Sequence, residues 1–267
     1  MMGKIVAGAL GFFILEPLGL GPLGALIGLY IGHQFDRGLG GFINPISAEE
    51  QQRIGACYFQ TTFSLLGYLA KSDGRVSKAE IAQAEALMAN MGLASEHRLE
   101  AIELFKAGAQ SDFSLERTMQ RFVGLCGRHN NLKQSLLNYL ISLALADGEL
   151  HSAEYQALQK IAAYLGFSKR LFDKFLEMIM AQSQFRASGS ASDRASSAGQ
   201  LNAAYKALGV SASNSDAEVK KAYRKLLSEN HPDKLIGQGM PDDMIKLATE
   251  RTQEIRKAYE LIVASRK

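Results

Sequence analysis

The stretch SDAEVKKAYRKLLSENHPDK, residues 215–234, carries the clearest structural signal in this chain of 267 residues. It opens with Ser215, a residue type that caps helices, and with early acidic charge at Asp216 and Glu218. One apolar stripe follows, formed by Val219, Ala222, Tyr223, Leu226 and Leu227. The helix must end near Asn230, because a residue that precedes proline is pushed out of the α region. The stretch therefore predicts an amphipathic helix followed by a His-Pro-Asp loop.

Helices are predicted on both sides of this stretch. Residues 201–208 form a short helical run that ends at Gly209, a natural C-terminal stop. Downstream, Pro241 suits the first position of another helix, with acidic charge beside it at Asp242 and Asp243. Intervals of three and four then separate Ile245, Ala248, Thr252, Ile255, Tyr259 and Ile262. This seam predicts an antiparallel helical hairpin with His-Pro-Asp in the connecting loop.

The second face of the 215–230 helix is basic and consists of Lys220, Lys221, Arg224 and Lys225. Such a face is by itself typical of a solvated helix. Its position directly before His-Pro-Asp favours a different interpretation, in which concentrated positive charge steers an acidic partner. His231 and Asp233 could also be taken as an acid/base pair of an enzyme. That alternative lacks a nucleophile, a second catalytic carboxylate and a pocket-forming glycine loop, so we expect no catalytic residue and no cofactor.

Residues 201–267 resemble the J-domain family over their whole length. The resemblance rests on Tyr205 with Leu208-Gly209, on AYRK at 222–225, on HPDK at 231–234, and on Ala258-Tyr259 followed by Leu261. It implies a co-chaperone that contacts an Hsp70 and triggers hydrolysis of ATP by that partner. In this interpretation Pro232 fixes the loop backbone, while His231 and Asp233 supply directional polar contacts. The expected Hsp70-binding residues are His231, Pro232, Asp233, Lys220, Lys221, Arg224 and Lys225.

The N-terminal residues 1–35 are predicted to contain a transmembrane helix. From Ile5 to Ile31 the only ionisable side chain is Glu16, and a helix of this length could span a bilayer core about 30 Å thick. A signal peptide is the main alternative, but its apolar region is usually only about 7–15 residues. Pro17 and Pro22 predict a kink. We expect an uncleaved membrane span.

Glycines four residues apart follow in this segment, at Gly24, Gly28 and Gly32. On one helix face they allow two backbones to approach closely in lipid, so they predict a homodimer through the transmembrane segment. The alternative is that the pattern has no role, since glycine is common in membrane helices.

Residues 52–181 are predicted to form an all-helical domain, because apolar residues recur at helical spacing and no stretch keeps a period of two. Examples are Phe59 with Phe63, and Leu99 with Ile102 and Phe105. Residues 182–200, QSQFRASGSASDRASSAGQ, are small and polar, and they predict a flexible linker to the J-domain. The fold class is therefore all-α, with a transmembrane helix, a helical bundle, a linker and a helical hairpin.

A short repeat lies within this domain. Residues 70–80, AKSDGRVSKAE, align with 144–154, ALADGELHSAE. Glycine suits a helix end that needs positive φ, and Ser77 and Ser152 are expected N-caps of the helices that follow. The acidic residues of the repeat could form a site for Ca²⁺ or Mg²⁺, but turn and capping chemistry alone explains all of them, so no metal site is expected. The metal-ligand candidates are Asp73, Glu80, Asp147 and Glu154. The repeat resembles the TerB-like family, which implies a binding or sensing module.

The composition of the chain argues against one class of partner and one class of metal site. A formal net charge of +3 is too small for a general nucleic-acid binder, so no nucleic acid is expected. Cys57 and Cys126 lie in apolar surroundings without metal-ligand spacing, and we expect both to be buried as small hydrophobic residues.

From end to end the chain resembles the DjlA-type, membrane-anchored co-chaperones of Gram-negative bacteria. The resemblance implies a role in the stress response, with cytosolic Hsp70 (DnaK) as partner and clients near the membrane. It places the protein in the bacterial inner membrane as a single-pass protein, with a short periplasmic N-terminus and the bulk of the chain in the cytoplasm. Flanking basic residues do not decide this orientation, because they are too evenly divided between the two sides. The alternative function is a metal- or envelope-sensing TerB-like module with the J-domain as its accessory effector.

Overall fold

The computed structural model describes residues 46–266, apart from 73, 75–83, 86–87, 90, 146–149 and 191–196. The chain divides into two units, Met1–Ser47 and Ala48–Lys267, and all the described helices belong to the second. The predicted transmembrane segment and its glycine pattern lie outside the described residues. Within the described part, no helix is both long enough and apolar enough to cross a bilayer.

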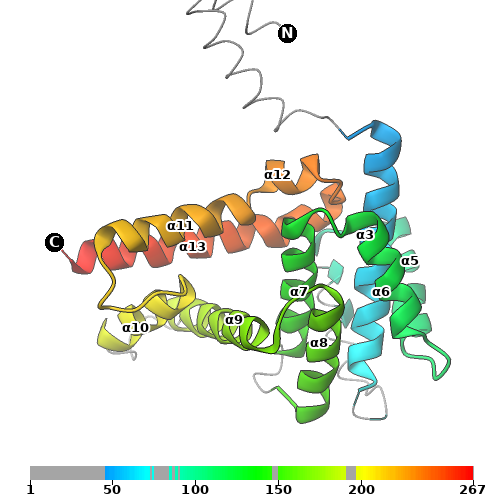
Figure 1. The fold of residues 1–267 in the computed structure, drawn as a ribbon, viewed down its shortest axis with the longest axis horizontal. Helices are drawn as coiled ribbons and strands as arrows, with labels where there is room; N and C mark the ends of the chain where they lie inside the picture. Colours follow the sequence, from blue (N-terminus) through cyan, green and yellow to red (C-terminus); the bar gives the residue numbers. More distant parts are fainter. Residues whose placement is uncertain are drawn as a thin grey trace, which may run out of the picture. The chain divides into compact units, whose positions relative to one another are not determined.

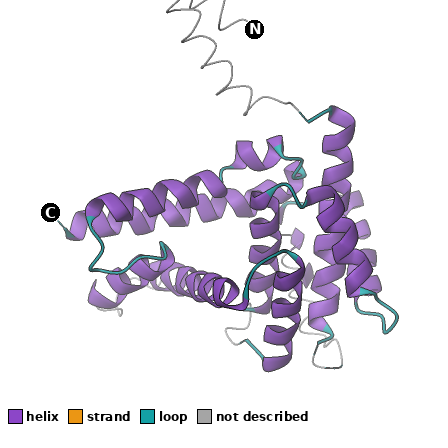
Figure 2. Cartoon of the chain, in the orientation of Figure 1, coloured by secondary structure: helices purple, strands orange, loops and turns teal. Residues whose placement is uncertain are grey.

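The described residues form helices and loops without a strand, as Figure 2 shows, which confirms the predicted all-α class. A helical body comes first in the chain and a smaller C-terminal module follows it (Figure 1). The body contains α3 (Ala48–Ala70), α5 (Ser95–Gly108), α6 (Leu115–Cys126), α7 (Asn130–Ala144), α8 (Ser152–Tyr164) and α9 (Lys169–Ser190). The C-terminal module contains α10 (Ser197–Ala207), α11 (Asp216–Glu229), α12 (Pro232–Gly237), the 3₁₀ helix η2 (Asp242–Met244) and α13 (Ile245–Ser265).

Helix α3 forms the centre of the body, because it contacts α5, α6, α7 and α8. Its sequence is apolar on more than one face, so side chains around most of its circumference are buried, including Tyr58, Phe63 and Leu66. The ring of Tyr58 packs against Phe122 of α6 and Tyr139 of α7, at centroid distances of 6.2 and 6.4 Å. Burial of large side chains of this kind contributes about 1.5–3 kcal/mol each.

Two glycines permit a close backbone contact between α3 and α5. A Cβ atom added at Gly67 of α3 would lie 1.9 Å from the carbonyl oxygen of Phe105, and one at Gly108 of α5 would lie 1.8 Å from that of Ser64. No real Cβ atom can approach an oxygen so closely. The backbones of α3 and α5 therefore meet at a crossing that only glycine allows on both sides.

The predicted helical hairpin of the C-terminal module is confirmed. Helices α11 and α13 pack side by side with α10 against α13 (Figure 1). Tyr223 and Tyr259 stack with their ring centroids 4.1 Å apart. The core consists of Ala204, Tyr205, Ala207, Leu208, Val219, Leu226, Ile255, Ala258 and Ile262.

The structure differs from the sequence prediction at the start of the third long helix. Pro241 does not occupy the first position of this helix; it precedes the 3₁₀ helix η2, and α13 begins only at Ile245. An additional short helix, α12, begins at Pro232. Pro232 and Pro241 are both suited to the first position of a helix. Helix α12 uses Pro232 in this way.

The segment 182–200, predicted as a flexible linker, overlaps two helices. Helix α9 continues to Ser190 and α10 begins at Ser197, while 191–196 lie outside the described residues. The two helices contact each other, and the buried Gln182 donates a hydrogen bond of 2.7 Å from its amide nitrogen to the carbonyl oxygen of Ala207. Small polar residues of this composition tolerate a helix when a neighbouring helix packs against it.

Candidate functional site

The His-Pro-Asp motif lies at the N-terminus of α12. His231 is the N-cap residue in an extended conformation, and its carbonyl oxygen accepts hydrogen bonds of 3.1 Å from the backbone nitrogens of Lys234 and Leu235. Pro232 occupies the first helical position, where its missing N–H costs nothing. The backbone of the motif is thus fixed by helix geometry rather than by a free loop.

The polar side chains of the motif point to solvent. The His231 and Asp233 side chains are 50% and 88% exposed, and His231 Nδ1 lies 3.9 Å from Asp233 Oδ2. Leu235, one turn further along α12, is buried and anchors the short helix. The motif therefore presents two directional polar groups on an anchored backbone, as expected for a contact site.

Residues around the motif hold it in place. The side-chain amide of Asn230 donates a hydrogen bond of 2.8 Å to the carbonyl oxygen of Leu226, which closes the end of α11. The carbonyl oxygen of Asn230 accepts a hydrogen bond of 3.1 Å from Thr252 Oγ1 of α13. Because Asn230 immediately precedes His231, the motif is tied to both long helices of the hairpin.

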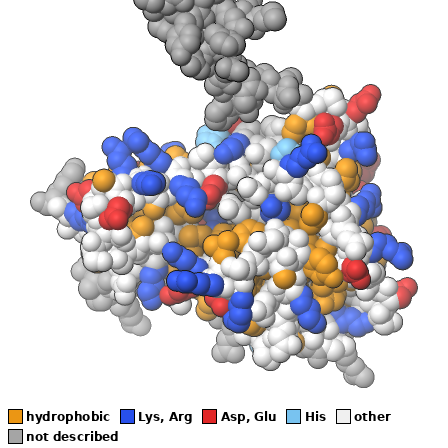
Figure 3. Space-filling view, viewed as in Figure 1, with side chains coloured by type: hydrophobic (Ala, Val, Ile, Leu, Met, Phe, Trp, Pro, Cys, Tyr) orange, Lys and Arg blue, Asp and Glu red, His pale blue; other side chains and the backbone are white. Residues whose placement is uncertain are grey.

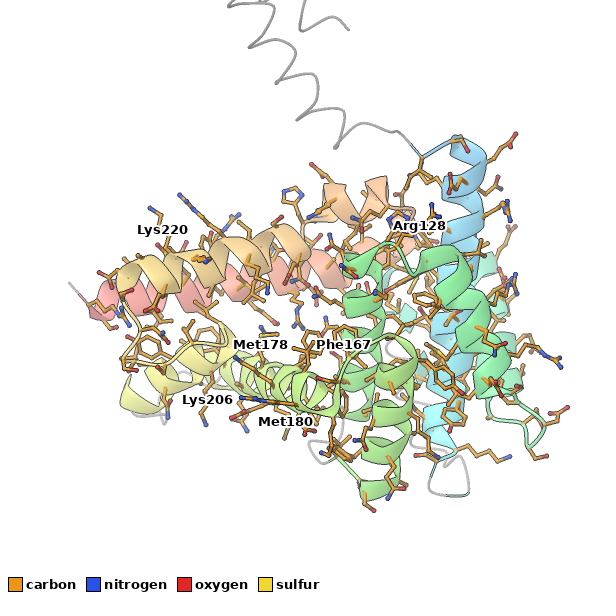
Figure 4. All side chains as sticks on the ribbon, in the orientation of Figure 1. Arg128, Phe167, Met178, Met180, Lys206 and Lys220 are labelled. Atoms are coloured by element: carbon orange, nitrogen blue, oxygen red, sulfur yellow. The ribbon has the colours of Figure 1, made fainter. Side chains whose placement is uncertain are left out.

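The basic face of α11 is exposed. Lys220, Lys221, Arg224 and Lys225 are all exposed, and Lys220 projects away from the helix in Figure 4. Figure 3 shows Lys and Arg side chains gathered over this part of the molecule. Lys225 Nζ lies 3.9 Å from Glu229 Oε1, a loose pair that leaves its charge available. The helix starts as expected, since Ser215 and Glu218 form a capping box.

The sequence did not predict that the C-terminal module packs on the body. The end of α12 and the residues after it lie against α3, where the side-chain amide nitrogen of Gln51 donates a hydrogen bond of 2.7 Å to the carbonyl oxygen of Ile236. Gly239 adopts a φ of +97°, and a Cβ atom there would lie 2.8 Å from Ile54 Cγ2. Gly239 offered a weak signal, since glycine is often used where backbones approach closely.

Three polar contacts extend this packing. Tyr139 of α7 donates its hydroxyl hydrogen to the carbonyl oxygen of Met244, and His97 of α5 is hydrogen-bonded to Asp243. The buried Arg251 of α13 donates to the side-chain oxygen of Asn138. Burial lowers the pKa of Arg251 to about 10, which leaves the guanidinium charged at neutral pH. Its amide acceptor is therefore an important partner for a charge removed from water.

Of the four metal-ligand candidates, only Glu154 lies within the described residues. Its carboxylate accepts a hydrogen bond of 3.0 Å from the backbone nitrogen of His151, which is the N-cap of α8. The prediction that Ser152 caps this helix was wrong by one residue, because Ser152 is its first helical residue. No group of three metal-binding side chains occurs in the described ranges. The other three candidates, Asp73, Glu80 and Asp147, lie outside the described residues.

Both cysteines are buried, as predicted. Cys57 and Cys126 are 1% and 0% exposed and carry free thiols. The apolar residues Leu99, Ile102 and Phe105 lie on a helix, α5, as their spacing predicts, but Leu99 is 67% exposed whereas Phe105 is buried.

Comparisons with known proteins agree with this geometry. Three family profiles match the chain: a co-chaperone DjlA transmembrane domain at residues 1–42, the tellurite resistance protein TerB at 60–176, and the DnaJ domain at 203–267. No solved structure matches significantly.

Curated relatives match over nearly the whole chain. Co-chaperone protein DjlA of Yersinia pestis is 39% identical over 253 residues, which cover 91% of each chain. Co-chaperone protein DjlA of Coxiella burnetii is 38% identical over 269 residues, which cover 98% of this chain and 96% of the relative. With its exposed His-Pro-Asp motif, its helical body and its matching N-terminal segment, the chain belongs to the DjlA family of membrane-anchored J-domain co-chaperones.

Proposed function

We propose that this co-chaperone stimulates the ATPase activity of a cytosolic Hsp70 (DnaK) through its J-domain. The observation that carries the proposal is the position of His231-Pro232-Asp233 at the start of α12, exposed and next to the basic face of α11. The charged and polar groups of this chain recognise the Hsp70, and the Hsp70 itself hydrolyses the ATP. The chain acts as a regulator rather than as an enzyme.

The two parts of the site have separate tasks. Lys220, Lys221, Arg224 and Lys225 produce a field that draws an acidic surface towards α11 and raises the rate of encounter. Once α11 is bound, His231 and Asp233 make short-range polar contacts on the Hsp70, with Pro232 holding their backbone in one conformation. The tight contact requires the motif, whereas the encounter requires only charge. The two tasks therefore differ in their dependence on salt.

The membrane segment determines which clients the Hsp70 reaches. We propose a single span with a short periplasmic N-terminus and the described residues on the cytoplasmic side, where Hsp70 acts on membrane-proximal clients. Close packing of two spans through Gly24, Gly28 and Gly32 would place two J-domains side by side. Protease protection in membrane vesicles tests the orientation, and cross-linking of wild-type and Gly28→Ile chains in lipid tests the dimer.

The experiment that tests the function is single-turnover ATP hydrolysis by DnaK with the full-length chain in nanodiscs. We expect the wild-type chain to accelerate hydrolysis and His231→Gln to leave the basal rate of DnaK. His151→Gln is the matched control, because His151 is 54% exposed, close to the 50% of His231, and lies on the body. Equal acceleration by the wild type and His231→Gln would refute the proposed mechanism.

A further inference from the structure

An open pocket of about 490 Å³ lies between the body and the J-domain, beside the His-Pro-Asp motif. The body lines it with the start of α7, the start of α9 and the turn between α8 and α9, where Figure 4 labels Phe167. The J-domain lines it with the last turn of α11 and the first turn of α12. We call it the junction pocket.

The J-domain side of the junction pocket is continuous with the proposed Hsp70 site. Lys225 belongs to the basic face of α11, and Lys234 directly follows Asp233 of the motif. Both line the pocket, and so does Ser228, which lies between them in the chain and accepts a hydrogen bond of 3.3 Å from Lys234 Nζ. A partner that contacts both the basic face and the motif therefore covers this side of the pocket.

The body side of the junction pocket exposes apolar surface. Leu171, at the start of α9, is 51% exposed, and Phe167 is only partly buried. The ring centroid of Phe167 lies 6.2 Å from that of Phe175, which is one helical turn beyond Leu171 on α9. Figure 3 shows hydrophobic side chains exposed on this face of the body. Apolar side chains gathered at the surface beside charged ones are typical of a protein–protein contact.

The charge at the junction pocket is positive on both sides. Lys133 comes from α7 of the body, whereas Lys225 and Lys234 come from the J-domain. Glu229 is the only carboxylate among the described residues that line the pocket. Its side chain is 20% exposed, and its Oε1 lies 3.9 Å from Lys225 Nζ. The pocket therefore has the same sign of charge as the basic face of α11, so an acidic partner drawn to that face suits both.

The two sides of the pocket are fixed relative to each other. Asn138, on the same helix as Lys133, accepts a hydrogen bond from the buried Arg251 of α13. On the J-domain side, Gln51 of α3 holds α12 through the carbonyl oxygen of Ile236. A surface that is already formed binds a partner without the entropic cost of ordering it.

We propose that the junction pocket extends the Hsp70-binding surface from the J-domain onto the body. Its occupant is an acidic segment of the Hsp70 that carries an apolar side chain. The carboxylates face Lys133 and Lys234, and the apolar side chain packs on Phe167 and Leu171. A small anion would leave these two apolar residues in water, and a purely apolar chain would leave the ammonium groups without partners. The inference rests on the proposed stimulation of DnaK, and it makes the body part of the docking surface.

Single-turnover ATP hydrolysis by DnaK, measured over a series of concentrations of the full-length chain in nanodiscs, tests this proposal. Leu171→Ser removes the exposed apolar contact. Lys133→Glu reverses one charge near the N-terminus of α7, where an acidic residue does not destabilise a helix. Each should raise the concentration for half-maximal stimulation about three- to tenfold, since each removes one interface contact. The effect of Lys133→Glu should shrink at high salt, whereas that of Leu171→Ser should persist.

Two variants on other surfaces are the controls. Leu99→Ser changes an apolar residue of α5 that is 67% exposed, and Lys160→Glu changes an exposed lysine of α8. Neither residue lines the junction pocket, so both variants should match wild type. Thermal unfolding verifies that all four variants are folded. If the wild type accelerates hydrolysis and the two pocket variants match it at every concentration, the pocket inference fails while the proposed function stands.

A photo-cross-linking phenylalanine analogue tests the contact directly. At position 171 it should capture DnaK in the presence of ATP, and at position 99 it should not. Combined with His231→Gln, the cross-link from position 171 should be lost, because the motif and the pocket belong to one binding event. Absence of a cross-link from position 171 to DnaK, or capture there of a permanently unfolded polypeptide instead, overturns the proposal. The cross-link is measured independently of hydrolysis, so its failure and that of the proposed function are distinguishable.

Discussion

Gln51 of α3 donates a hydrogen bond of 2.7 Å to the carbonyl oxygen of Ile236 in α12, and so joins the body to the helix that begins with His-Pro-Asp. The two residues are 185 positions apart in the chain. At its other end, the J-domain is held by α10, which packs on α9. The J-domain is thus attached to the body at two places, and the direction in which His231 points is fixed relative to α3.

Replacement of Gly239 by alanine should loosen this attachment. The added Cβ atom would lie 2.8 Å from Ile54 Cγ2, and the φ of +97° is unfavourable for any residue with a Cβ. We expect a loss of about 1–3 kcal/mol in the free energy of unfolding, measured with urea. Gly237→Ala is the control, because nothing lies within 4 Å of a Cβ there. An equal loss in both variants would contradict the contact.

The crossing of α3 and α5 should not tolerate a methyl group. Gly67→Ala forces the helices apart, since the new Cβ atom would lie 1.9 Å from the Phe105 carbonyl oxygen. The expected destabilisation is about 3 kcal/mol, at the upper end of overpacking costs. Gly124→Ala on α6 meets nothing within 4 Å and should stabilise the chain by up to about 1 kcal/mol through helix propensity. Urea unfolding of both variants gives the comparison, and a stable Gly67→Ala chain would speak against the crossing.

The pair of Asn138 and Arg251 should be sensitive to loss of its acceptor. Asn138→Ala leaves the buried guanidinium of Arg251 without this hydrogen bond, at an expected cost of about 1–3 kcal/mol. Asn138→Asp keeps an acceptor oxygen and adds an opposite charge, so it should unfold at a urea concentration equal to or above that of wild type. The idea fails if the alanine and aspartate variants are equally destabilised.

The contact of His97 with Asp243 should depend on pH. The hydrogen bond to Asp243 holds the pKa of His97 above its ordinary value, and Glu100 and Glu96 add to this effect. Because the pKa is raised in the folded state, the stabilisation is fully present below the ordinary value of about 6.5 and disappears as the pH rises through the folded pKa. The His97 side chain is 55% exposed and that of Asp243 is 27% exposed, so solvent screens the pair and its contribution is at most about 1 kcal/mol.

Urea unfolding at a series of pH values, from below the ordinary histidine pKa of about 6.5 to mildly alkaline pH, measures this dependence. Wild type should exceed His97→Gln in stability at the acidic end only, and Asp243→Asn should remove the same difference. A stability difference between wild type and His97→Gln that does not change with pH would show that protonation of His97 does not strengthen its contact with Asp243.

Local chemistry explains what could be predicted from the sequence. The start of α11 at Ser215 and its end before Pro232 are set by residues within one helical turn, and the seam of α13 repeats along a single helix. The docking of Gln51 on Ile236 has no such local signal, because it depends on which surfaces meet after the helices have formed. For the same reason Gly67 and Gly124 look alike in the sequence, although only Gly67 faces another backbone. Leu99 shows the reverse case, an apolar residue at core spacing that the orientation of α5 leaves in water.

Because Gly239 fits tightly against Ile54, two constraints act on the segment around Gly239. The α12 segment must preserve the shape that a partner recognises, and it must also fit the surface of α3. A J-domain transplanted from a free-standing relative would meet only the first requirement. Positions 54 and 239 should therefore change together during divergence, so that a bulkier residue at 239 is accompanied by a smaller one at 54. The body and the J-domain would then be inherited as one matched pair rather than as exchangeable modules.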